Sequence, residues 1–323
     1  MKKYEFTGET KEYCGITLRR IRALVTIAGV VTAGDLGGWI ESEKNLSQMY
    51  DDAWVYGNAW VYGDARVYDN ARVYSNAQVY DDARVYSDAR VHGNAQVYGN
   101  AQVYGNAWVY GDARVYGNAQ VYGDAQVYDN ARVYDNAQVY GDARVYGDAW
   151  VYGDARVYGN AKVYGDAQVY SDAQVYGDAR VYNNAQVHGD ARVYGNAWVY
   201  SDAKVYGNAQ VYDNAWVYGN AWVYGDAQVY GNARVYGNAQ VYGDARVYGD
   251  DSWCSFSSFG SSYRTTTAFR DEKLGIRIVC GCFTGSLEDF REEVIQTHGE
   301  NSKHGKLYLD MANMIEYRFS DEG

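Results

Sequence analysis

Residues 53–248 repeat one six-residue phrase, Ala-x-Val-Tyr-Gly-(Asp/Asn), thirty-three times without an insertion. The alanine recurs from Ala53 to Ala245 and the valine from Val55 to Val247. A phrase of this length cannot enclose a globular core of its own, so each repeat must bury its apolar side chains against other repeats. The sequence therefore predicts a coil that stacks on itself.

We number the phrase from valine: Val 1, Tyr 2, Gly 3, Asp or Asn 4, Ala 5 and a variable residue 6. Positions 5, 6, 1 and 2 alternate apolar and polar or aromatic residues, as in a strand that points Ala and Val inward. Gly and Asp or Asn both tolerate left-handed backbone angles, so we expect positions 3 and 4 to form a corner. Three strands and three corners close a coil of eighteen residues, and thirty-three phrases give eleven coils.

The phrase resembles the hexapeptide-repeat family of left-handed β-helices over about 200 residues. The resemblance implies an all-β, left-handed parallel β-helix, a triangular β-solenoid with eighteen residues per coil and about eleven regular coils. Position 2 departs from the family, since it holds Tyr in thirty-one repeats and His in two. We divide the chain into an N-terminal cap and entry coil (1–50), the β-helix (51–250) and a small C-terminal α+β module that acts as a cap or docking module (251–323).

Both ends of the chain differ from the repeat, as a stack with open edges requires. We expect strands at 4–6, 17–27 and 30–32, and an entry coil at 34–41. In the C-terminal module we expect a strand at 276–280, a helix from 287 to about 297 with Ser286 as its N-cap, and a second helix at 307–317. Residues 252–267 either finish the coil or form a hairpin. Both ends are similar to segments of phage- and prophage-type repeat proteins.

Residues eighteen apart lie in one column on one face of such a coil, so position 6 can be sorted by face. Tryptophan falls on two of the three faces, which indicates a candidate interaction face because Trp is a frequent interface anchor. A Tyr column runs beside each face, and it either supports itself by lateral stacking or forms an adhesive platform. The candidate interaction residues are Trp54, Trp108, Trp198 and Trp216 on one face, and Trp60, Trp150 and Trp222 on the next.

The charged residues follow a second pattern, in which nine of the twelve Arg residues at position 6 lie two residues after an Asp. We interpret this as local charge matching on a solvated surface, with a small contribution from each exposed pair. The formal net charge of −12 argues against nucleic-acid and anionic-membrane partners. No apolar signal segment follows Lys2 and Lys3, and residues 23–31 are too few to span a bilayer, so we expect a cytoplasmic location.

Many hexapeptide-repeat proteins are acyltransferases with a catalytic His, which makes the four histidines worth testing. His92 and His188 replace Tyr at position 2 on different faces, and His298 and His304 lie near the C-terminus. The four cysteines, Cys14, Cys254, Cys280 and Cys282, lack the spacing of a zinc site, and we expect free thiols. The sequence predicts no catalytic, cofactor-binding or metal site.

Three hypotheses for function follow. The first is a non-enzymatic β-solenoid scaffold or interaction protein of phage or prophage origin. The second is a hexapeptide-repeat acyltransferase that uses His298 or His304. The third is a rod that binds a glycan or a protein through its Trp and Tyr faces. The partner is therefore an unknown protein or glycan, or further copies of the chain in a trimer or joined end to end.

Overall fold

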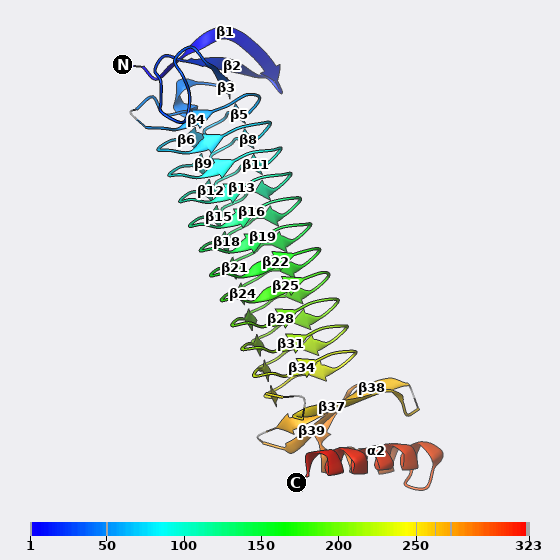
Figure 1. The fold of residues 1–323 in the computed structure, drawn as a ribbon. Helices are drawn as coiled ribbons and strands as arrows, with labels where there is room; N and C mark the ends of the chain where they lie inside the picture. Colours follow the sequence, from blue (N-terminus) through cyan, green and yellow to red (C-terminus); the bar gives the residue numbers. More distant parts are fainter. Residues whose placement is uncertain (1, 50, 250, 262, 272, 321–323) are drawn as a thin grey trace. The chain divides into compact units, whose positions relative to one another are not determined.

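The computed structural model describes residues 2–49, 51–249, 251–261, 263–271 and 273–320 (Figure 1). The chain divides into two compact units, Met1–Gly177 and Asp178–Gly323, and each is described by itself. Both contain parallel β-solenoid coils of eighteen residues, and the second also carries the C-terminal module. The predicted fold is thereby confirmed as a parallel β-solenoid with a small module of strands and helices.

The first unit begins with a β-hairpin, whose two strands overlap the predicted strands at 4–6 and 17–27. β1 (Tyr4–Tyr13) pairs antiparallel with β2 (Ile16–Ala23), and β2 pairs with β3 (Leu36–Ile40). β3 then pairs in parallel with β5 (Trp60–Val61) and begins the solenoid register. β3 lies within the segment 34–41 that we expected as an entry coil, whereas the predicted strand at 30–32 is reduced to an isolated bridge between Ile27 and Val31.

Each solenoid strand covers positions 6 and 1 of one repeat. The strands run from β4 (Trp54–Val55) to β24 (Gln174–Val175) in the first unit. β22 (Lys162–Tyr164) and β25 (Arg180–Tyr182) extend by one residue into position 2. Within each unit the strands form three parallel sheets in which each residue pairs with the residue eighteen positions away, as Gln96 does with Arg114.

The core consists of the two inward positions of the phrase. Every Ala at position 5 is fully buried, and every Val at position 1 is at most 1% exposed. Burial of a Val side chain stabilises a fold by about 1.5–3 kcal/mol, and three such residues lie in each coil. The inward pattern predicted from the sequence is confirmed throughout the repeat.

The corners lie at positions 3 and 4, as predicted. All positive φ angles within the repeat fall at position 3, at 55° for Gly57 and 57° for Asp81. A Cβ atom on Gly63 would lie 3.0 Å from the amide nitrogen of Asp81 in the next coil. Asp81 offsets its strained backbone because its carboxylate accepts a hydrogen bond from the Gly99 amide at 3.1 Å.

Apart from the bonds within the paired strands, the backbone hydrogen bonds between coils run in one direction. The Gln96 amide donates to the Ala113 carbonyl at 2.9 Å, and the Tyr98 amide donates to the Val115 carbonyl at 3.0 Å. Each coil thus directs the amides of positions 6 and 2 toward the following coil and the carbonyls of positions 5 and 1 toward the preceding one. A stack of this kind ends with unpaired carbonyls at its first coil and unpaired amides at its last coil.

The N-terminal segment supplies donors to the first coil. The Lys3 ammonium donates to the Ala53 carbonyl at 3.0 Å and pairs with the Asp51 carboxylate at 2.5 Å. The buried Asn45 amide donates to the Gly63 and Ala65 carbonyls, each at 3.0 Å. These side chains take the place of the amides that a preceding coil would provide.

The second unit contains the strands from β25 (Arg180–Tyr182) to β36 (Arg246–Val247) and then the C-terminal module. The module has a four-stranded antiparallel sheet followed by two helices, which cover one face of that sheet. Its elements are β37 (Trp253–Phe259), β38 (Arg264–Asp271), β39 (Gly275–Cys280), β40 (Phe283–Ser286), α1 (Leu287–His298) and α2 (Lys303–Phe319).

The module supplies acceptors to the last coil. The Thr267 hydroxyl accepts from the Gln240 amide at 3.2 Å, and the Ser252 hydroxyl accepts from the Gly249 amide at 3.1 Å. The predicted N-cap is confirmed, since the Ser286 hydroxyl accepts from the Asp289 amide in a capping box. The second helix is longer at both ends than predicted, and residues 252–267 belong to the hairpin of β37 and β38.

The Asn45 contacts generate a stability prediction. Asn45→Asp keeps the shape of the side chain but removes both donors, so two buried carbonyls lose their partners at about 1–3 kcal/mol each. We expect the urea midpoint of the full chain at pH 8 to fall accordingly. Asn58→Asp, at an exposed corner, is the matched control and should change stability by less than about 0.5 kcal/mol. Equal midpoints for Asn45→Asp and the native chain would contradict the proposed capping role.

Candidate functional site

The Tyr side chains of position 2 form ladders of parallel rings. In the first unit the rings of Tyr62 and Tyr80 are 5.0 Å apart between centroids and 2° from parallel, and those of Tyr80 and Tyr98 are 4.8 Å apart. This offset stacking confirms the predicted lateral support. Burial beside the neighbouring rings raises the pKa of the Tyr104 hydroxyl to about 12.

The predicted interaction residues have different degrees of exposure. Trp54 is fully buried and contacts the ring of Tyr4 edge-on at 6.3 Å, so it offers no free surface. Trp108 and Trp222 are the most exposed, at 36% and 38%. Trp60, Trp150, Trp198 and Trp216 are partly buried.

Neighbouring side chains cover a ring face of most of these indoles. A cation from the adjacent coil lies over the ring in five cases, at 4.8–5.2 Å from the centroid. Such contacts contribute about 0.5–1 kcal/mol at exposed sites. The pairs are Arg90–Trp108, Arg132–Trp150, Arg180–Trp198, Arg234–Trp216 and Lys204–Trp222.

One of these arrangements extends over four coils of the second unit. Trp198 and Trp216 stack on each other at 5.1 Å and 5° from parallel. Arg180 covers the outer face of Trp198, and Arg234 covers the outer face of Trp216. The four side chains form one closed stack with charged ends, which leaves no ring face for a ligand.

A shallow groove in the second unit lies between two side-chain columns, those of positions 4 and 6. It encloses about 610 Å³ and contains the exposed edge of Trp222. Its walls are amides with one acid and one base, a set that can donate to and accept from hydroxyl groups. The lining residues are Asn184, Gln186, Asp202, Lys204, Asn220, Trp222, Asn238 and Gln240.

The Asp residues that precede Arg make different contacts from those predicted. Asp88 accepts a hydrogen bond from the Asn70 amide at 3.1 Å, and Asp112 accepts from Asn94 at 2.9 Å. In the described part of Met1–Gly177, no ion pair joins such an Asp to the Arg two residues later. The predicted local charge matching is wrong as a set of contacts, because side chains at the corner reach along the column to the next coil.

The two histidines of the repeat are members of the aromatic ladders. His92 lies between Tyr74 at 5.1 Å and Tyr110 at 4.9 Å, and His188 stacks on Tyr206 at 5.0 Å. Burial lowers the pKa of His92, and the nearby Arg90 adds to this effect. The ring faces of His92 are occupied, so its structural role resembles that of the Tyr it replaces.

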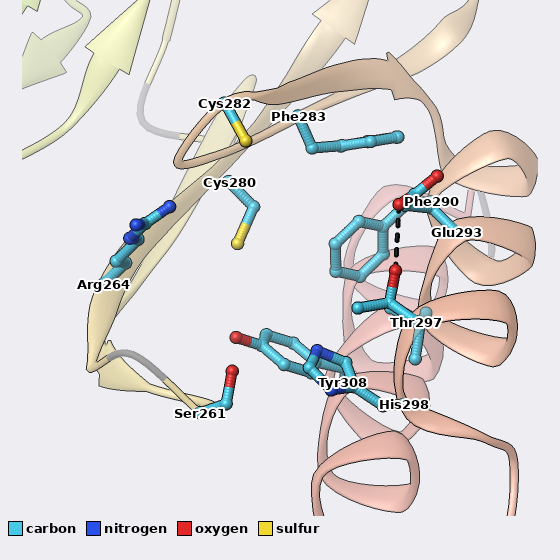
Figure 2. Close-up of a pocket in the computed structure, with 11 residues that line it drawn as sticks. Ser261, Arg264, Cys280, Cys282, Phe283, Phe290, Glu293, Thr297, His298 and Tyr308 are labelled. Carbon is cyan, nitrogen blue, oxygen red and sulfur yellow. Dashed lines mark hydrogen bonds between the residues drawn. The ribbon is translucent and has the colours of Figure 1, made fainter.

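The other two histidines lie in the C-terminal module, where His298 lines a pocket of about 270 Å³ (Figure 2). The His298 ring stacks on Tyr308 at 5.4 Å, and its centroid is 6.1 Å from that of His304. The Cys280 thiol accepts a hydrogen bond from the Thr266 hydroxyl at 3.1 Å. The lining residues are Ser261, Arg264, Cys280, Cys282, Phe283, Phe290, Glu293, Val294, Thr297, His298 and Tyr308.

The four cysteines are free, and burial raises the pKa of the Cys254 thiol to about 11. Within the described ranges, no three His, Cys, Asp or Glu residues are grouped so that they could hold a metal ion.

Sequence reasoning missed the cation–Trp pairs, although a Lys or Arg eighteen residues from a Trp was a usable signal. It also missed the groove and the C-terminal pocket, whose residues converge only in the folded chain.

Comparison with known proteins identifies a family of repeats. A family model described as YdcK Beta solenoid repeat matches segments that together cover half of the chain. No annotated protein matches this chain. Among the described helices, none is long and apolar enough to cross a bilayer. The matched segments are 77–93, 95–111, 101–117, 107–123, 125–137, 137–153, 155–171, 173–189, 185–201, 209–225, 227–241 and 239–251.

The position of His92 generates a pH prediction. Its lowered pKa means that the folded chain binds a proton less readily than the unfolded chain, so this residue destabilises the fold as pH falls through about 6.5. Around it lie Tyr74, Tyr110, Trp108 and the positive Arg90. His92→Tyr should raise the free energy of unfolding more at pH 5 than at pH 8, as measured by urea titration.

The reciprocal variant Tyr128→His, in the same ladder, should lose stability at pH 5 relative to pH 8. If both variants keep the pH dependence of the native chain, the ladder does not disfavour the charged imidazole.

Proposed function

Because the chain belongs to the YdcK β-solenoid repeat family, we propose that it is a non-enzymatic scaffold that holds interaction partners at fixed spacing. The observation that carries the proposal is the unbroken eighteen-residue register. In this register every inward Ala and Val is buried, and each outward side chain lies beside the side chain eighteen residues away in the next coil. Such a repeat gains length by addition of coils without a change of core. The resemblance of the two ends to phage-type proteins extends the proposal to a phage or prophage origin.

The hydrogen bonds at the two ends of the solenoid affect how copies of the chain would associate. Lys3 and Asn45 already satisfy the carbonyls that another coil would use, and Thr267 satisfies an amide at the other end. These contacts favour association through the side faces, as in a trimer, over end-to-end joining.

A second candidate function is glycan binding in the groove of the second unit. The specific observation in its favour is an open groove with amide, carboxylate and ammonium groups beside the exposed edge of Trp222. Such groups exchange hydrogen bonds with hydroxyls, and a groove that follows the coils suits a linear chain of sugars. The stack of Trp198 and Trp216 is less suitable, because cations cover its ring faces.

The scaffold proposal predicts that the solenoid tolerates changes by whole coils. Deletion of residues 95–112 removes one coil of eighteen residues and joins Asn94 to Ala113 in the same phrase. We expect a folded chain with a cooperative melting transition close to that of the native protein. Deletion of residues 95–97 leaves one side of a coil three residues short, so the Val columns cannot continue and the melting temperature should fall sharply.

Circular dichroism melting checks both deletions, and loss of folding in the eighteen-residue deletion would contradict a modular scaffold. The same preparations are tested with acyl-CoA and sugar-nucleotide donors. Turnover that is lost in His92→Ala, His188→Ala or variants of His298 and His304 would replace the scaffold by the acyltransferase hypothesis.

The glycan proposal predicts a loss of affinity in Trp222→Ala. Interface anchors of this kind contribute on the order of 1–2 kcal/mol or more, which corresponds to a loss of about tenfold in affinity. A glycan array identifies the strongest hexasaccharide, and calorimetric titration then measures its affinity. Trp108→Ala is the matched control, because Trp108 has nearly the same exposure and a covering Arg but lies outside the groove. An equal affinity in both variants would reject the groove.

A further inference from the structure

One Tyr ladder of the first unit is an uninterrupted series of phenols, which we call the Tyr62 ladder. Its consecutive ring centroids are separated by 4.8–5.0 Å, and no pair departs by more than 4° from parallel. At this spacing the offset rings are in van der Waals contact, so their π-systems overlap. Its members are Tyr62, Tyr80, Tyr98, Tyr116, Tyr134, Tyr152 and Tyr170.

The ladder on another face of the same unit is interrupted. There Tyr56 and Tyr74 meet edge-on at 83°, and the next ring is the imidazole of His92. Imidazole is much harder to oxidise by one electron than phenol. Continuity of oxidisable rings is therefore a property of particular ladders and not of every column in the repeat.

The Tyr62 ladder also has a defined entrance. The Tyr13 ring in the hairpin is 5.0 Å from Trp60 and 6.1 Å from Tyr62. Tyr13 is 39% exposed, and the following residue, Cys14, is an exposed free thiol. An oxidant that approaches this hairpin thus meets an exposed phenol in contact with the first ring of the series.

We propose that the Tyr62 ladder is a one-electron relay, which carries an oxidising equivalent from the Tyr13 hairpin along successive coils. An external one-electron oxidant, of the metal(III) polypyridyl or peroxyl-radical class, takes one electron from Tyr13. The Tyr13 hydroxyl releases its proton to water, which leaves a neutral tyrosyl radical and the reduced oxidant.

Each later step exchanges a radical for a phenol. An electron passes from an intact ring to the neighbouring radical, which takes up a proton from water, while the newly oxidised ring releases its own proton. The hydroxyls can do this because Tyr80 and the later members of the ladder are only partly buried, and Tyr62 keeps 8% of its surface exposed. No net proton or electron is consumed within the ladder, so its length is set by the number of contacting rings.

The test labels Cys14 with a ruthenium polypyridyl and oxidises it by a laser flash with an irreversible electron acceptor. Cys254→Ala, Cys280→Ala and Cys282→Ala remove the other thiols. Tyr152 is replaced by 3-aminotyrosine, which is easier to oxidise and therefore traps the oxidising equivalent far along the ladder. Transient absorption and electron paramagnetic resonance then detect the aminotyrosyl radical.

We expect the trapped radical in the otherwise intact chain and its loss in the double variant Tyr98→Leu/Tyr116→Leu. The matched control is Tyr104→Leu/Tyr122→Leu, which makes the same change in a neighbouring ladder and should retain the signal. Circular dichroism melting confirms that both double variants fold alike. An equal signal in both variants, or a Tyr13 radical without a trapped radical in the intact chain, would overturn the proposal.

Discussion

The backbone hydrogen bond from one coil to the next determines most of this structure. It joins an amide to a carbonyl seventeen residues later, as from Gln96 to Ala113, and it repeats in the same direction through each unit. Because the register is constant, every side chain lies against the residue eighteen positions away. Because the direction is constant, the first coil presents carbonyls that need hydrogen-bond donors, and the last coil presents amides that need acceptors. This polarity explains why the first coil meets the ammonium of Lys3 and the amide of Asn45, whereas the last meets the hydroxyls of Thr267 and Ser252.

The same register decides which outward residues a column can hold. Tyrosine stacks favourably on itself, and an Asn can donate to the Asn or Asp that follows it, as Asn70 does to Asp88. Arginines also lie in consecutive coils, as Arg114 and Arg132 do, whereas a Trp next to an Arg gives a cation–π pair, as for Arg132 and Trp150. On the face that lacks Trp, the Tyr86 hydroxyl donates to Gln102 of the next coil at 3.2 Å.

Sequence reasoning succeeded where one residue and its local neighbours decide the outcome. The inward Ala and Val, the eighteen-residue register and the Ser286 cap are set by short patterns with known geometry. It failed where a distant segment intervenes, as at Trp54, which resembles the other Trp residues in sequence but is buried beside Tyr4. The corner at positions 3 and 4 was predicted correctly, but the tolerance of Asn and Asp for a left-handed backbone could not show that only position 3 adopts it. The left hand of the coil comes from the family resemblance and stays a prediction.

Dense aromatic packing does not by itself make a stacking platform for ligands. Sugars and planar ligands stack on ring faces, but along these ladders each face is covered by a neighbouring ring or cation, as Trp198 is by Trp216 and Arg180. What reaches solvent is a series of ring edges and hydroxyls. Recognition from outside must then use the polar columns and the grooves between them, such as the one beside Trp222. The covered faces have their largest effect along the coil axis, where contact between rings stiffens the stack and gives electrons a continuous path.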